Sequence, residues 1–210
     1  MNLKNKSGVT ISVLVVTIIV MLILFGITFS TGSNLLRNTQ RNKMKTMLYM
    51  VKARAEILIE DYLFEYDNLN LESLADRKNI LNGIDDNIKL GGTYLDPQSN
   101  INIIEKVGFE AKDDDTGQFY KKSEIIYCKW DETELKKQGI DTKNLAQGDT
   151  IIVKYEMYTP EKLKDVDTAN LKGYSIVADV DVASTKGYRT KDESGNAIAI
   201  HSLTEFEEKK

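Results

Sequence analysis

The hydrophobic pattern of this chain has two regimes. An uncharged run occupies Val9–Phe29, and beyond it apolar residues recur at intervals of three and four positions. About 20 residues at ~1.5 Å rise match a bilayer hydrocarbon core of ~30 Å, so the run is long enough to cross a membrane as a helix. The chain therefore predicts a membrane anchor close to its start, with a polar domain behind it.

The periodic region predicts an amphipathic helix that continues the anchor. Its apolar positions follow one face of an α-helix, namely Met44, Met47, Leu48, Val51, Ala55, Leu58 and Tyr62. No proline occurs between Met1 and Leu95, and a nearly continuous helix over Val9–Tyr66 would be on the order of 85 Å long. The alternative is a break at Ser30–Asn34, because Ser, Gly and Asn favour turns.

The residues from 67 to 210 predict one α+β domain with a small antiparallel β-sheet. Helical spacing occurs over Leu69–Ile80, and capping boxes begin short helices after Asp131 and at Ser202–Glu205. Period-two or β-rich runs predict strands at Ile101–Ile104, Gln118–Tyr120, Glu124–Trp130, Thr150–Tyr158, Tyr174–Val182 and Ala197–Ile200. Lys191–Asn196 is predicted to form the turn before the last strand. These alternating strands would bury one sheet face beneath the long helix.

The border between the charged start and the apolar run decides what kind of anchor this is. Eight residues carrying Lys4 and Lys6 end at Gly8, directly before the run. A secretory signal has a shorter apolar core and a small-x-small cleavage site. A plain signal anchor would fit the length but would not need Gly8. The third alternative is a leader that is cut on the cytoplasmic side while the whole apolar segment is retained.

This border resembles the N-terminus of type IV pilin-like and pseudopilin proteins, most closely the Gram-positive type with GITLI-x-LVVTIIVLLILAG. Val9-Thr10-Ile11, then LVVTIIV from Leu14 to Val20, then Leu22-Ile23-Leu24 and Gly26 follow that pattern. The likeness covers roughly the first 30 residues. It implies that a prepilin peptidase cuts between Gly8 and Val9 and that the new amino group of Val9 is N-methylated.

The resemblance also implies an organisation for the chain. Residues 1–8 would be the leader, 9–29 the transmembrane helix, 30–66 the amphipathic continuation of the helical spine, and 67–210 an extracytoplasmic α+β globular domain. The residues expected to contact lipid or a neighbouring spine are Leu14, Ile18, Leu22 and Phe25, together with Val9 itself.

One residue departs from the family pattern. The family usually has Glu at the fifth mature position, where this chain has Val13. The role of that Glu is to neutralise a neighbour's N-terminal ammonium inside the apolar bundle, where an unpaired charge is costly. With Val13 there, either the methylated terminus stays near the membrane interface, or the subunit sits where no neighbour needs the pairing, such as a filament tip. The residue therefore favours a minor or tip subunit over a major repeating one.

The basic flanks bear on orientation. Lys4 and Lys6 precede the run, whereas four basic residues follow it before the first acid at Glu56, namely Arg37, Arg41, Lys43 and Lys45. Counting the flanks alone favours a cytoplasmic C-terminal domain. A cut at Gly8 instead requires the leader inside and the domain outside, as a single-pass protein of the cell membrane and, once assembled, of a surface filament.

Composition and candidate chemistry narrow the function further. The net charge of −4 over 210 residues argues against a nucleic-acid surface, which needs clustered Lys and Arg. The single Cys128 excludes an intramolecular disulfide and the single His201 leaves only one Cys–His pairing, so we expect no enzyme and no cofactor.

Asp113 and Asp115 in the DDDTG segment are a weak calcium candidate, because acids do not alternate as in an EF-hand loop; a solvated hairpin turn is the alternative.

The first hypothesis is a membrane-anchored pilin-like structural subunit that assembles through its N-terminal helix for adhesion, secretion, motility or DNA uptake. Its partners would be other pilin-like subunits, the prepilin peptidase and membrane lipid. The second hypothesis is a singly anchored extracytoplasmic binding or sensory domain that never polymerises.

Overall fold

The structure is a computed structural model that describes residues 11–67, 90–143, 145–158 and 177–208; within these ranges, side chains are described except at 11–17, 22–35, 65–67, 158 and 177. The chain divides into two compact units, Met1–Asn42 and Lys43–Lys210, and the boundary between them falls inside the first helix. In the part of the chain that the structure describes, no helix is both long enough and apolar enough to cross a membrane. The predicted helix at Leu69–Ile80 lies outside the described residues.

The first helix, α1, extends from Ile11 to Asp67. It is helical through Ser30–Asn34, so the alternative of a break there is wrong. The expected inner face is confirmed: five of its seven residues are at most 3% exposed and the other two, Met44 and Leu58, pack against them. Propensity alone seldom stabilises such a helix, and this face is held by tertiary packing.

Five antiparallel strands form one sheet in the order β1-β2-β3-β4-β5. The strands are β1 Thr93–Leu95, β2 Ile125–Trp130, β3 Ile151–Tyr158, β4 Val177–Lys191 and β5 Ala197–Ser202. The predicted strands at β2, β3 and β5 are confirmed to within two residues at each end. The sheet and its helices make the domain α+β, as expected.

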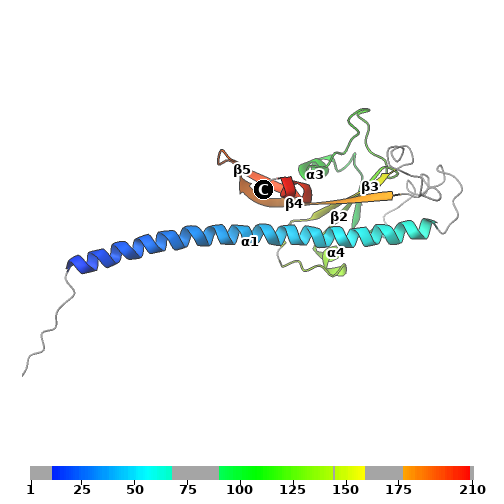
Figure 1. Ribbon diagram of the computed structural model, residues 1–210. Helices are drawn as coiled ribbons and strands as arrows, with labels where there is room; N and C mark the ends of the chain where they lie inside the picture. The colour runs from blue at the N-terminus through cyan, green and yellow to red at the C-terminus, as the bar shows by residue number, and fades with distance from the viewer. Residues whose placement is uncertain (1–10, 68–89, 144, 159–176, 209–210) are drawn as a thin grey trace, which may run out of the picture. The chain divides into compact units, whose positions relative to one another are not determined.

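Both faces of the sheet are buried, whereas the sequence pattern predicts only one. Within Lys43–Lys210, α1 lies along one face with α4 (Glu132–Lys137), and α3 (Ile101–Lys106) covers the other (Figure 1). In β3, Ile151, Val153 and Tyr155 enter the core beneath α1, while Ile152 enters the core beneath α3. The second core comes from α3 and the loop after it.

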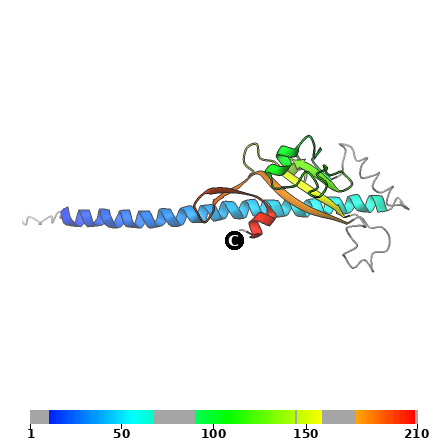
Figure 2. The same ribbon diagram turned by 90° about the horizontal axis from the view of Figure 1, so that it is seen from above.

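The two predicted capping boxes are confirmed. Asp131 accepts the backbone N–H of Glu134 at 2.9 Å and begins α4. Ser202 accepts the N–H of Glu205 at 3.3 Å, and the Glu205 carboxylate accepts the N–H of Ser202 at 3.4 Å, at the start of α5 (Leu203–Glu208). Seen from above, α5 lies beside α1 (Figure 2), where the Tyr49 hydroxyl donates to Glu207 at 2.5 Å.

Three predicted elements differ from the structure. Ile101–Ile104 is not a strand but the start of α3, because the Asp96 side chain closes a turn by accepting the N–H of Ser99. Gln118–Tyr120 forms only an isolated bridge, between Lys112 and Phe119. The strand expected to end at Val182 continues to Lys191, since β5 pairs with its second half.

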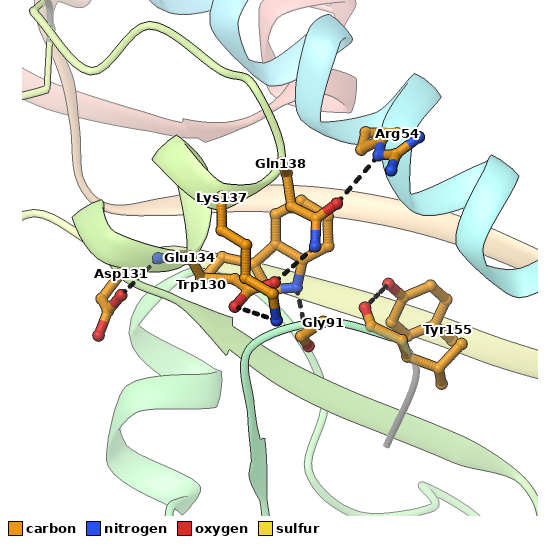
Figure 3. Close-up of polar contacts among 9 residues, drawn as sticks. Arg54, Gly91, Trp130, Asp131, Glu134, Lys137, Gln138 and Tyr155 are labelled. Atoms are coloured by element: carbon orange, nitrogen blue, oxygen red, sulfur yellow. Dashed lines mark hydrogen bonds and ion pairs between the residues drawn. The ribbon is translucent and has the colours of Figure 1, made fainter. Parts of the chain in front are cut away.

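A chain of polar contacts joins α1 to α4 (Figure 3). The Arg54 side chain donates from Nε to Gln138 Oε1 at 2.9 Å, and Gln138 donates to Glu134 at 2.6 Å. Beneath them, Trp130 and Tyr155 donate to the backbone carbonyls of Gly91 and Leu90 at 3.1 and 2.8 Å. The helix is therefore attached to the domain by directional bonds as well as by apolar packing.

Candidate functional site

The predicted processing site, Gly8 and Val9, lies outside the described residues, as do the side chains of Leu14, Leu22 and Phe25. Ile18 is the one predicted packing residue whose side chain the structure describes, and it is 51% exposed. Ile19, Val20 and Met21 beside it are exposed to between 47% and 73%.

A second apolar surface runs along α1, on the side away from the sheet. We call it the outer row: Met50, Ile57 and Phe64, which are 43%, 47% and 69% exposed. Met50, Ile57 and Phe64 are spaced by seven residues, a repeat that keeps side chains on nearly the same face of a helix. Because the inner face of the same segment is buried under the sheet, α1 is apolar on two opposite sides.

Sequence reasoning missed the outer row. Its signal was present as the seven-residue spacing, but the inner face carries a stronger three-and-four pattern over the same residues. Single exposed apolar side chains are common on protein surfaces and need no explanation. Several large ones on the same face of a helix indicate an interaction surface.

The acidic DDDTG segment is the hairpin turn that the sequence left as an alternative. Asp113 accepts the N–H of Thr116 at 2.8 Å through its side chain and the N–H of Gly117 at 2.8 Å through its carbonyl. Gly117 has a φ of 66°. Asp114 and Asp115 are exposed. Throughout the described residues, no three His, Cys, Asp or Glu side chains are grouped to hold a metal ion.

Cys128 and His201 belong to separate surroundings. Cys128 is 1% exposed in β2, and burial raises the pKa of its thiol to about 12, which keeps it protonated and unreactive. His201 is half-buried, and its Nδ1 lies 2.7 Å from the backbone oxygen of Ser184. The two side chains therefore form no catalytic pair.

A buried polar cluster surrounds Asp149. Its carboxylate is 3% exposed and accepts the Ser184 hydroxyl at 2.6 and 2.7 Å, the Thr185 hydroxyl at 3.0 Å and the Lys186 N–H at 2.8 Å. A serine, a histidine and an aspartate thus meet here. The arrangement is not that of a nucleophile, because Ser184 is fully buried and His201 contacts its backbone oxygen rather than its hydroxyl.

The Asp149 cluster instead shapes β4. It binds the irregular stretch between Ala183 and Tyr188, where β4 shifts register against β5. The sequence contains no signal for this cluster, because Asp149 and Ser184 are 35 positions apart.

No family model, no curated protein and no solved structure matches this chain. Among the described residues, the outer row of α1 is the strongest candidate for a functional surface.

Proposed function

We propose that this protein is a type IV pilin-like subunit, processed by a prepilin peptidase and assembled with other such subunits through its N-terminal helix. The leader would end at Gly8, Val9–Phe29 would insert in the membrane, and the α+β domain would lie outside it. The observation that carries the proposal is the outer row, which leaves α1 apolar on the side that the domain does not cover.

The physical argument concerns burial. A helix that served only to support its own domain would need one apolar face, and polar residues would cover the rest. Burying a large side chain such as Phe64 or Ile57 against a partner is worth about 1.5–3 kcal/mol. A row of such side chains supports lateral packing of α1 against helices of neighbouring subunits.

The test is the N-terminus of the mature protein, determined by mass spectrometry from membranes that contain a prepilin peptidase. We expect a chain that begins with N-methylated Val9. Gly8→Ala should leave the full-length chain uncut, whereas the neighbouring Ser7→Ala should be processed normally. Retention of the leader in the wild type, with the protein monomeric in the membrane, would refute the proposal and favour an anchored binding domain.

A further inference from the structure

A groove opens on the domain between α1, the first half of β4, and α5. Its volume is about 440 Å³, within the range of binding sites for small ligands or single side-chain clusters. The lining comes from Tyr49, Ala53 and Glu56 of α1, from Asp179 and Asp181 of β4, and from Glu207 of α5, together with neighbouring residues.

The groove carries an excess of negative charge. Its two lysines are each paired with a glutamate that also lines it: Lys52 with Glu56 at 3.9 Å, and Lys154 with Glu156 at 3.6 Å. Asp179, Asp181 and Glu207 also line the groove, so five acids face two lysines there. A cationic partner is therefore favoured.

The strand that forms one wall of the groove is not open to an added strand. Opposite β3, the described residues provide no pairing strand for Val177–Val182, because β5 joins β4 only from Ala183 onward. Yet the N–H groups of Val180 and Val182 are taken at 2.8 Å by the carboxylates of Asp179 and Asp181. Charged side chains on an edge strand prevent pairing there, so a partner is not expected to add a strand. A helix that presents cationic side chains to the acids of the groove fits instead.

The outer row lies next to the groove on α1. Ala53 lines the groove, and Met50 and Ile57 are three residues before it and four after it, which places all three on one helix face. A complementary partner would therefore be a helix with exposed apolar side chains beside Lys and Arg, and without acids.

The same chain contains such a segment. Residues 36–45 are helical, Leu36 is 66% exposed, and Arg37, Arg41, Lys43 and Lys45 occur with no acidic residue before Glu56. We propose that the acidic groove of one copy receives this basic segment of α1 from a second copy. The inference rests on the proposed function and specifies the register of subunits within the assembly.

The register follows from the positions on the helix. If Asn42 at the centre of the basic residues lies against Ala53 in the groove, two parallel α1 helices are offset by about 11 residues, or roughly 16 Å at 1.5 Å per residue. An arrangement without offset would instead bring the stretch around Ala53 of the second helix, with Glu56 and Glu60, to the acidic groove.

Disulfide cross-linking of the full chain in membranes tests this register. Two differently tagged copies, one with Asn42→Cys and one with Ala53→Cys, are expressed together and oxidised; both positions are exposed. We expect the mixed 42–53 dimer at several-fold the yield of the 53–53 and 42–42 dimers from matched pairs. Predominance of the 53–53 or 42–42 product would overturn the inference and leave the proposed function standing. The absence of every dimer would count against both.

A charge exchange gives an independent readout. Asp179→Lys with Glu207→Lys should reduce the yield of the 42–53 dimer at least several-fold, and adding Lys43→Glu with Lys45→Glu in the partner copy should restore it. Both acids are exposed, so we expect the domain to remain folded, as checked by Trp130 fluorescence. A 42–53 yield unaffected by the exchange would refute the role of the groove.

Discussion

The indole N–H of Trp130 donates to the backbone oxygen of Gly91 over 3.1 Å, and this bond holds the Gly91–Gly92 turn against strand β2. The turn is tightly packed: a Cβ added to Gly92 would lie 2.4 Å from the Lys129 oxygen and 2.5 Å from Cδ1 of Trp130. Gly108 has a similar positive φ, 84° against 72°, but no atom lies within 4 Å of its added Cβ.

Alanine substitutions at these two glycines therefore distinguish the cost of backbone strain from the cost of a steric clash. Gly108→Ala should cost only the left-handed backbone conformation, about 1–2 kcal/mol. Gly92→Ala should cost that and the displacement of β2, about 3 kcal/mol or more in total. Urea unfolding of the detergent-solubilised chain, followed by the fluorescence of the single tryptophan, measures both. Equal losses for the two variants would contradict the close approach.

Substitutions of Ile57 and Ile59 should affect different properties, assembly for Ile57 and stability for Ile59. Ile59 is 3% exposed beneath the sheet, whereas Ile57 is 47% exposed in the outer row. Ile59→Ala should lower the free energy of unfolding by about 2–4 kcal/mol. Ile57→Ala should change it by less than about 0.5 kcal/mol but reduce the amount of cross-linked oligomer in membranes. An Ile57→Ala variant that assembles like the wild type would argue against the outer row as an interface.

Asp149 should be essential for the stability of β4. Its replacement by Ala leaves the buried Ser184 hydroxyl and the Lys186 N–H without their acceptor, which we expect to cost about 2–4 kcal/mol in the free energy of unfolding. Asp114→Ala, at an exposed position of the acidic turn, is the matched control and should be nearly neutral. Hydrogen exchange should show the loss concentrated in β4 and β5; unchanged protection there would contradict the assignment.

Asp181 should make the domain less stable as the pH rises. Burial raises the pKa of its carboxyl above the ordinary 3.8, against the lowering effects of the Val182 N–H and of Lys154 and Lys52. Because the folded state binds this proton more tightly than the unfolded state, the contribution is favourable below pH 3.8 and is lost as the pH rises through the folded pKa. Asp181→Asn should therefore unfold at higher denaturant than the wild type at pH 7.

The comparison at low pH is the control for Asp181. Below pH 3.8 the wild-type carboxyl is protonated, so the advantage of Asp181→Asn should disappear. An advantage that is the same at pH 3 and pH 7 would show that it comes from something other than the charge.

Cys128 should not react with alkylating reagents in the folded protein. Its thiol is 1% exposed and has a pKa of about 12, so the reactive thiolate is scarce at pH 8 and the reagent has no access. Iodoacetamide should label it only after denaturation, as measured by mass spectrometry. Rapid labelling of the native chain would contradict its burial.

Local signals in the sequence predicted much of the fold. The alternation in Ile151–Tyr158, the capping residues Asp131 and Ser202, and the inner face of α1 each reflect interactions between residues close in the chain, which sequence patterns report directly. The prediction of a strand at Ile101–Ile104 was wrong because a run of four mostly apolar residues fits either a strand or a helix. The turn that Asp96 closes decides between them.

What the sequence by itself determined is the amphipathic helix, the α+β character of the domain and the Gly8 border that motivates the proposed processing. Only the tertiary structure decided that both faces of the sheet are buried, that Asp149 meets Ser184, and that the groove beside Ala53 is acidic. These features depend on side chains brought together from distant positions, and their free energies come from burial and contacts that exist only after folding. The outer row lies between the two cases: its spacing is in the sequence, but its exposure depends on which face of α1 the sheet covers.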